Sequence, residues 1–466
     1  MALVEQIANI WRIRDLRRRL AITVGLIAVC RIGCYIPVPG IDVESLGRIA
    51  KSTGSTGLGG ILMWVNMFSG GALGRGAIFG LGVMPYISAS IIFQLLATVV
   101  PSLESLRKEG EAGYKKLNQY TRIATVFICM FQGALVVRGL YVFGVVPSVV
   151  SQSLLASLWF SLSNGFLLMV GTMFLMWIGE QIDEHGIGNG ISIIIMVNIL
   201  DRLPSAIWNL GHGIALDESQ QSAVLKIAAL VALFVTVVVA IIYITRGERR
   251  IPVQHAKHVR GPRVYGGQKL YLPLRVNMAG VMPLIFASCL LQFPATIAAA
   301  AAHALSPDSL WYKLFNGVQG ALLPSGGTLP FSYVFLNGLL IFFFCYFWTA
   351  ITFNPKDVSE NLKDNGSFIP GIRPGKRTSD YLESIVNRVT LAGSFFLVII
   401  ALMPISIAWI MNVDLTVAGF YGGTSILIVV GVALDLVTKI NDHLEMRRYE
   451  GFAAGASGRR RLRRRR

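Results

Sequence analysis

Ten runs of mostly apolar residues are separated along the chain by shorter polar segments. A membrane-spanning helix needs about 20 such residues, and glycine or proline is tolerated inside it when neighbouring groups satisfy the backbone. The pattern therefore predicts an all-α polytopic membrane protein with ten transmembrane helices. The ten runs are 21–38, 77–99, 121–143, 154–178, 189–208, 222–245, 276–300, 330–353, 388–411 and 419–440.

The composition excludes an ordinary soluble domain. Of the 466 residues, 54% are hydrophobic and 14% are charged, whereas soluble domains average about 45–50% apolar and about 25% charged residues. So few charges do not cover a water-soluble globule of this size, and so apolar a chain is not typical of disorder. The bilayer is the remaining solvent.

Positive charge is concentrated in alternate connections between the runs. The formal net charge is +17, from 42 Lys and Arg against 25 Asp and Glu. Because cytoplasmic loops carry an excess of Lys and Arg, this asymmetry predicts that both chain ends lie in the cytoplasm. Of the 42 basic residues, 32 lie in the segments 1–20, 101–121, 246–275, 354–388 and 441–466.

The positions of the runs also predict the domain organisation. Ten spans with a basic loop near the middle are compatible with two pseudo-symmetric five-helix halves of opposite topology. This expectation rests on counting, since the sequence shows no convincing repeat. We expect a basic cytoplasmic segment over 1–20, halves over 21–208 and 209–440, and a basic, disordered tail over 441–466.

A shorter apolar stretch precedes the second run. Residues 61–76 are rich in glycine and are too few to span the membrane. Irregular backbone at membrane depth is tolerated only inside protein or against a water-filled cavity. The stretch therefore predicts a short re-entrant segment beside a cavity.

Signatures of catalysis are missing from the sequence. It contains no G-x-x-x-x-G-K-[ST] phosphate loop and no H-E-x-x-H zinc motif. Arg31, Arg75 and Arg138 are either functional or structural residues, and Asp435 precedes Lys439 by four residues, which favours a simple helix-face ion pair. We therefore expect neither an enzyme nor an ion-coupled pump, and no cofactor.

Cysteine and histidine give no site either. All five cysteines lie in apolar runs, which favours buried free thiols, although Cys30 and Cys34 share one helix face. His255 and His258 have no further metal ligand nearby, so we interpret both as loop residues rather than as a zinc site.

Long motifs in a fixed order provide the most specific signal. From the first run to about residue 440 they resemble the bacterial SecY family, the central subunit of the Sec protein-translocation channel. The stretches that carry the resemblance are Asn66–Leu73, Met84–Ile92, Lys108–Gly110, Gln119–Arg122, Gly171–Trp177, Gly179–Ile182, Gly186–Ser192, Arg249–Gln254, Val276–Pro283, Asn354–Pro355, Ile369–Gly375 and Gly422–Ser425.

The resemblance implies an hourglass of ten helices around a central pore, closed at its waist by a ring of six aliphatic side chains. A narrow aliphatic collar blocks ions by dewetting, and it yields around an extended polypeptide. Without the resemblance, we would interpret these side chains as ordinary core or lipid-facing residues. Matched position by position, the ring falls on Val83, Ile87, Ile191, Ile195, Ile285 and Ile428.

The resemblance also assigns a plug and a lateral gate. Gln94 and Asn277 match polar positions of the gate that opens to lipid, although polar contacts between helices explain them equally well. The stretch 61–76 resembles the plug that closes the resting channel, and its glycines suit a mobile hinge. The plug residues are Asn66, Met67, Phe68, Ser69, Gly70 and Gly71.

The two basic loops 246–275 and 354–388 resemble docking sites for a ribosome and for the SecA motor ATPase. Contacts between arginine and ribosomal RNA phosphates would be electrostatic and salt-sensitive, whereas membrane topology alone would also account for some of these charges. Pro262 departs from a basic residue often found in the family. The docking residues are Arg249, Arg250, Lys257, Arg260, Arg263 and Arg373.

The family implies a passive, gated channel in the bacterial inner membrane. Unfolded preproteins would cross through the ring, their signal sequences and other hydrophobic segments would leave sideways into the phospholipid bilayer, and SecE and SecG would be partner subunits. The tail Arg459–Arg466 lies outside the resemblance, and anionic lipid and ribosomal RNA are both compatible targets. The alternative from another class is a secondary transporter of small solutes, which would need a polar site at the membrane midplane.

Overall fold

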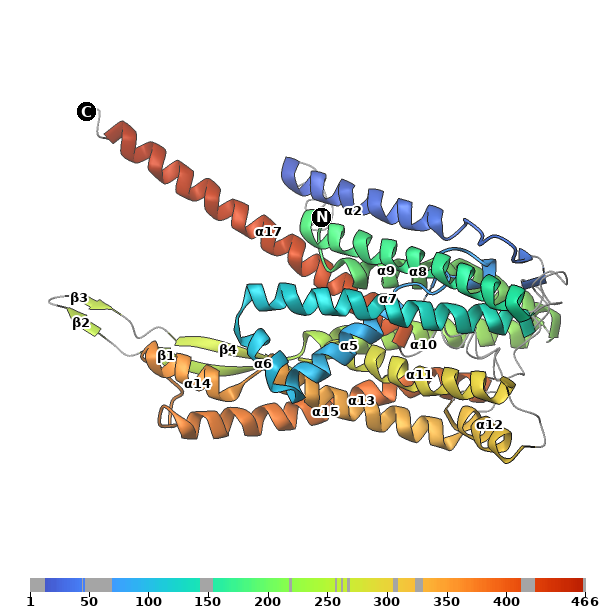
Figure 1. Cartoon of the computed structure of the whole chain (residues 1–466). Helices are drawn as coiled ribbons and strands as arrows, with labels where there is room; N and C mark the ends of the chain where they lie inside the picture. The colour runs from blue at the N-terminus through green and yellow to red at the C-terminus, as the bar shows by residue number, and fades with distance from the viewer. Residues whose placement is uncertain are drawn as a thin grey trace. The chain divides into compact units, whose positions relative to one another are not determined.

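The structure is a computed structural model that divides into two compact units. The first unit comprises Met1–Pro204 and Val432–Arg466, and the second comprises Ser205–Gly431. Figure 1 shows the elements of both, coloured along the chain. The residues described are 13–43, 45–46, 69–142, 154–217, 220–255, 258–260, 263–265, 269–304, 309–322, 330–411 and 424–463.

Helices make up most of the first unit. Pro85 and Pro101 lie at the starts of α5 and α6, where the missing proline N–H costs no helical hydrogen bond. Two helices, α9 and α17, extend across the boundary into the second unit. The elements are α2 (Arg14–Gly33), the 3-10 turn η1 (Leu73–Arg75), α5 (Met84–Val99), α6 (Pro101–Lys108), α7 (Glu111–Val142), α8 (Leu154–His185), α9 (Gly190–Asp217) and α17 (Thr424–Arg463).

Glycines bring the helices of this unit into backbone contact. A Cβ atom built on Gly133 of α7 would lie 3.0 Å from the carbonyl oxygen of Gly165 on α8. A Cβ on Gly190 would overlap the carbonyl of Gly179, so the start of α9 also rests directly on α8. Small residues permit this close packing, which is how helices associate in lipid.

The first and last helices meet within the first unit. Leu16 of α2, Ile187 before α9 and Ile440 of α17 form one buried apolar cluster. The side chain of Thr23 accepts a hydrogen bond from the Ile187 N–H at 3.2 Å. These contacts explain why residues beyond 432 belong to the same unit as the N-terminal helices.

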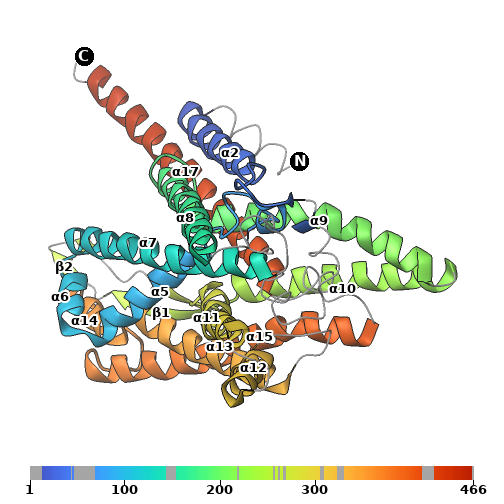
Figure 2. The ribbon, with the colours of Figure 1, turned by 45° about the vertical axis from the view of Figure 1, so that its right-hand side comes forward.

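The described part of the second unit contains six further helices. The Phe286 ring on α11 meets the rings of Phe344 and Trp348 on α13 edge to face, at centroid distances of 5.7 and 5.4 Å. Figures 1 and 2 both show α11 and α13 side by side. The helices are α10 (Gln220–Arg246), α11 (Met282–Ala304), α12 (Leu310–Leu322), α13 (Phe331–Thr352), α14 (Pro355–Asp364) and α15 (Lys376–Met411).

The second unit also carries two small antiparallel sheets. The larger has the strand order β4-β1-β5, with Ile251 opposite Leu272 and Gln254 opposite Phe368. The smaller is the β2–β3 hairpin. The strands are β1 (Glu248–His255), β2 (His258–Arg260), β3 (Arg263–Tyr265), β4 (Lys269–Arg275) and β5 (Ser367–Phe368).

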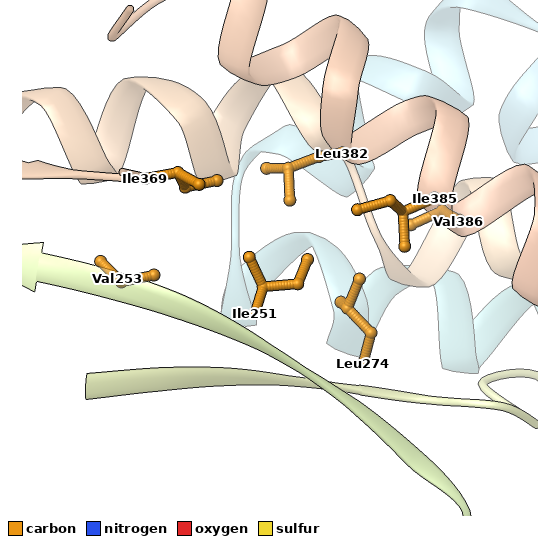
Figure 3. Packing of buried hydrophobic residues seen from close by; sticks show 7 residues of the cluster. All are labelled: Ile251, Val253, Leu274, Ile369, Leu382, Ile385 and Val386. Atoms are coloured by element: carbon orange, nitrogen blue, oxygen red, sulfur yellow. The ribbon is translucent and has the colours of Figure 1, made fainter. Parts of the chain in front are cut away.

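An apolar cluster joins this sheet to α15, and Figure 3 shows it from close by. Ile251 and Val253 alternate with exposed neighbours along β1, which is the period of a strand with one buried face. The described parts of the two basic loops therefore form one folded body, which we call the platform (the described residues within 248–275 and 354–388). Its buried cluster consists of Ile251, Val253, Leu274, Ile369, Leu382, Ile385 and Val386.

Helices lie on all ten predicted runs, which supports the predicted helical fold, and the described residues add five short strands that the prediction did not include. His255 and His258 lie in β1 and β2, not in a loop. The reason is that alternating apolar residues in the basic loops gain a buried face by pairing. Among the described residues, five helical stretches are long and apolar enough to cross a membrane: Glu111–Arg138, Ala156–His185, Ile227–Arg246, Phe331–Asp364 and Lys376–Met403.

The disorder expected of the tail over 441–466 stays a prediction. Helix α17 continues to Arg463, and residues 464–466 lie outside the described ranges. The segment contains nine Arg and three Ala residues, and both types have high helix propensity.

Candidate functional site

Four of the six residues assigned to the ring lie in the first unit as two pairs, each one helical turn apart. Val83 precedes the first turn of α5, and the Ile87 N–H donates to its carbonyl at 3.1 Å. Ile191 and Ile195 lie in the first two turns of α9. Val83, Ile87 and Ile195 are buried and Ile191 is half-buried, so none is exposed as a lipid-facing residue would be.

The other two ring residues lie in the second unit. Ile285 is in the first turn of α11, and Ile428 is near the start of the described part of α17. Both are buried. All six assigned residues thus lie near the start of the described part of a helix.

Local sequence explains why α9 begins beside its ring pair. The side chain of Asn189 accepts from the Ser192 N–H at 3.0 Å, and the Gly190 N–H donates to Asp183 at 2.8 Å. Asparagine is among the best residues for capping a helix start. The motif of residues 186–192 therefore fixes the first turn of α9.

Only part of the assigned plug is described. Asn66, Met67 and Phe68 lie outside the described residues. Ser69 is buried, and Gly70 and Gly71 have φ angles of +65° and +82°, values that favour glycine because they need no Cβ. We call residues 69–76 the gate turn. It is a packed turn ending in η1, not an exposed hinge.

A carboxylate beside the gate turn pairs with two arginines. Oδ2 of Asp201 on α9 lies 3.2 Å from Nη1 of Arg31 on α2 and 4.0 Å from Nη2 of Arg75. Arg31 also donates from Nη2 to the carbonyl of Val197 at 2.6 Å, and the Arg75 guanidinium lies 4.4 Å from the centroid of the Tyr35 ring. We call Arg31, Arg75 and Asp201 the Asp201 corner.

These contacts settle how the intramembrane arginines are placed. Arg31 and Arg75 make half-buried structural contacts, while Arg138 is exposed. Asp435 and Lys439 form the predicted helix-face pair at 3.4 Å. All five cysteines are buried free thiols, as predicted. Asp201 was missed by the sequence analysis, although an acidic residue inside an apolar run is a known signal of function.

The two assigned gate residues lie in different units. Gln94 on α5 donates from Nε2 to the Ser90 hydroxyl at 3.1 Å, and within the described residues its buried Oε1 has no hydrogen-bond partner. Asn277 donates from Nδ2 to the Gly280 carbonyl at 3.0 Å. Both amides are thus engaged within their own helix or turn.

Two adjacent arginines on β1 differ in their charge environment. Arg250 contacts Oε1 of Glu248 through both Nε and Nη2 at 2.7 Å. Arg249 is exposed, and no acidic partner for it is found within the described residues. The charge of Arg250 is therefore largely compensated and that of Arg249 is not.

The tip of the platform is described only through its backbone. Arg260 on β2 lies opposite Arg263 on β3 in the hairpin register. Lys257 and Pro262 lie outside the described residues. The register places two basic positions side by side at the tip.

Arg373 lies in a turn that is fixed from both sides. The hydroxyl of Thr378 donates to the Arg373 carbonyl at 2.9 Å, and the Ser359 hydroxyl on α14 donates to the Gly375 carbonyl at 2.7 Å. Gly371 and Gly375 have φ angles of +83° and +103°. The exposed Arg373 side chain therefore projects from a rigid backbone.

Two of the sequence motifs meet in space. Arg122 on α7 donates from Nε to Oε1 of Glu180 on α8 at 3.0 Å, and its Nη2 lies 2.7 Å from the same oxygen. The pair is partly exposed, so its contribution to stability is small. It fixes how α7 and α8 align near their polar ends.

Solved structures share this arrangement of helices. The chain resembles "The structure of a protein conducting channel" with a TM-score of 0.61 at 16% identity, covering 91% of this chain and 92% of that one. It resembles Sec61 in a canine ribosome–channel complex with a TM-score of 0.58 at 15% identity and the same coverage. The protein is therefore a multi-pass membrane protein with the fold of the protein-conducting channels.

Sequence relatives specify the family. The SecY family profile matches residues 77–437. The translocase subunit SecY of Thermotoga maritima is 42% identical over 95% of this chain and 96% of its own length, and that of Escherichia coli is 41% identical over 94% and 93%. The chain belongs to the SecY family.

Proposed function

We propose that the protein is the channel subunit of a protein translocase, through which unfolded preproteins cross the cytoplasmic membrane. The observation that carries this proposal is the similarity to translocase subunits over 95% of the chain at 42% identity. The fold shared with protein-conducting channels supports it. Hydrophobic segments leave sideways into lipid, next to Gln94 and Asn277.

The ring residues close the channel between substrates. Their aliphatic side chains lie near the described starts of four helices and are buried or half-buried. This burial suits a collar that excludes water and ions. The plug residues, from Asn66 to Gly71, seal the resting state. In one similar solved channel, the plug domain of the SecY protein stabilises the closed state and maintains a membrane seal.

The platform binds the partners that supply energy. We assign this role to Arg249, Lys257, Arg260, Arg263 and Arg373, with Arg250 contributing less because Glu248 compensates it. Ribosomal RNA phosphates attract such a surface, and one similar structure is a ribosome–channel complex. SecA is the proposed motor, and SecE and SecG are the proposed companion subunits.

The concentration of Lys and Arg in alternate connections supports ten spans with both ends in the cytoplasm. The platform then lies on the cytoplasmic side, where a ribosome or motor is accessible. A secondary transporter of small solutes is not favoured, because the relatives are translocase subunits.

Reconstitution tests the function directly. The full chain with SecE and SecG is placed in proteoliposomes, and protection of a preprotein from added protease is followed with SecA and ATP. We expect protected preprotein only when ATP is present. Uptake of small solutes without preprotein protection would overturn the proposal and favour the transporter.

A further inference from the structure

The gate turn rests on α9 at both of its ends. At its start, a Cβ built on Gly70 would lie 3.1 Å from Oδ1 and 3.2 Å from Cα of Asn198. At its end, Arg75 pairs with Asp201 one helical turn further along. On its other side, the Val38 N–H donates to the Gly76 carbonyl at 2.7 Å, which ties the turn to the segment after α2.

The strengths of the two ion pairs at the Asp201 corner are unequal. The Arg31 side chain is 18% exposed and lies 3.2 Å from the carboxylate, whereas that of Arg75 is 39% exposed and lies 4.0 Å away. Shorter and less exposed pairs are the stronger ones. The Arg75–Asp201 pair, which the gate turn makes, is thus the weaker of the two and breaks first.

Sharing one carboxylate makes that contact reversible. A buried carboxylate left without a partner is costly, but Asp201 keeps Arg31 when Arg75 leaves. The released guanidinium retains the Tyr35 ring, which also attracts a cation. Release of the gate turn therefore leaves no uncompensated charge on α9.

Asp201 and the ring pair Ile191 and Ile195 lie on the same helix, and the gate turn begins with the last three plug residues, 69–71. The contacts that hold the gate turn on α9 therefore also position residues 69–71 of the plug relative to the ring pair on α9. Resting on the proposed function, we propose that Arg75 and Asp201 are positioning residues that hold the plug in its closed position, with Arg31 preserving Asp201 for reclosure.

The test measures resting ion leak of the reconstituted channel without preprotein. We compare wild type with Arg75→Gln, Asp201→Asn and the double variant. Each single variant is expected to raise the leak roughly fivefold, the shift that loss of one partly exposed ion pair causes in a two-state equilibrium. The double variant is expected to leak no more than Asp201→Asn, because both changes remove the same contact.

Two controls separate this role from a structural one. Asp435→Asn removes a carboxylate from the exposed pair with Lys439 on α17, and it is expected to leave the leak at the wild-type value. The thermal midpoint of each purified complex is measured alongside. Arg75→Lys, which keeps the charge, is expected to restore most of the seal.

Unchanged leak in Arg75→Gln would overturn the proposal, as would strictly additive leaks in the double variant. If Asp201→Asn fails to assemble, Arg75→Gln decides alone, because its more exposed side chain is removed without disturbing the Arg31 pair. Failure of wild type to protect preprotein would instead contradict the proposed function, so the two failures are distinguishable.

Discussion

The gate turn and the turn around Arg373 are both short, glycine-containing and bent through positive φ angles, yet they are anchored by different forces. Ile369 at the start of the Arg373 turn belongs to the apolar cluster of the platform. The gate turn ends instead on the Asp201 corner. The Arg373 turn is thus held by apolar packing together with hydroxyl hydrogen bonds, whereas the gate turn has an ionic contact.

Their surroundings explain the difference. The platform is built from the polar, basic loops, where the hydrophobic effect of water drives apolar side chains together. Within the spans, lipid is as apolar as leucine, so association depends on close packing and polar contacts. We therefore expect that breaking the apolar cluster costs more stability than breaking the ionic contact.

The largest effect is expected from breaking the apolar anchor. Leu382 is fully buried in the platform cluster, and Leu382→Ala should cost about 2–5 kcal/mol of stability from lost burial and the cavity that remains. Thermal unfolding monitors the loss, and SecA binding should fall with it. Leu382→Met is the volume-matched control, and a loss as large in that variant would contradict the cavity explanation.

A polar substitution in the ring is expected to raise the resting ion leak of the channel and to leave the platform folded. Ile428→Asn places a buried amide at a position with 1% exposure, at a cost of about 1–3 kcal/mol for an unsatisfied polar group. Resting ion leak should rise, and preproteins with defective signal sequences should be accepted. Ile428→Val keeps an aliphatic side chain and should stay sealed. Equal leak in both variants would remove Ile428 from the ring.

A third prediction concerns the exposed Arg373 side chain, which projects from its turn without helping to anchor that turn. Arg373→Ala should weaken SecA binding roughly tenfold, the typical loss for one central arginine in an interface. Stability should not change, because the turn is held by its backbone carbonyls. Arg377→Ala, at another exposed position four residues later, is the matched control. A similar loss in both variants would indicate diffuse charge rather than a specific contact.

The smallest expected effect is a change in the salt dependence of ribosome binding when an arginine of β1 is replaced. Arg249→Ala should lower the salt dependence of ribosome binding by about one charge contact, measured as the slope of log affinity against log salt. Arg250→Ala should change it less, because Glu248 already compensates Arg250. The reverse order would show that the Arg250–Glu248 pair opens on binding.

The helical elements were predictable from the sequence because a span requires a long apolar run, and all ten runs contain a helix. The platform was not predicted. Its signal was the alternation around Ile251 and Val253 in β1, but the abundance of arginine favoured a solvated loop. A strand whose partner β5 lies more than a hundred residues away leaves no local trace of the pairing.

The candidate site was predictable to different degrees. Aliphatic residues such as Ile285 and Ile428 are chemically ordinary, so only the resemblance to a family singles them out. Asp201 was the opposite case, since its chemistry is unusual for a membrane span but no motif marked it. Its partners Arg31 and Arg75 were noticed singly, because pairing across 126 to 170 residues of sequence is visible only in the fold.

The long-range pairing of β1 with β5 has a consequence for synthesis of the chain. His255 hydrogen-bonds Ser367, 112 residues later, so β1 leaves the ribosome long before its edge and its apolar face are covered. At about 5–20 residues per second, that interval is roughly 6–22 s. The three-stranded sheet of the platform is therefore completed late, after the helices α11 and α13 have been made.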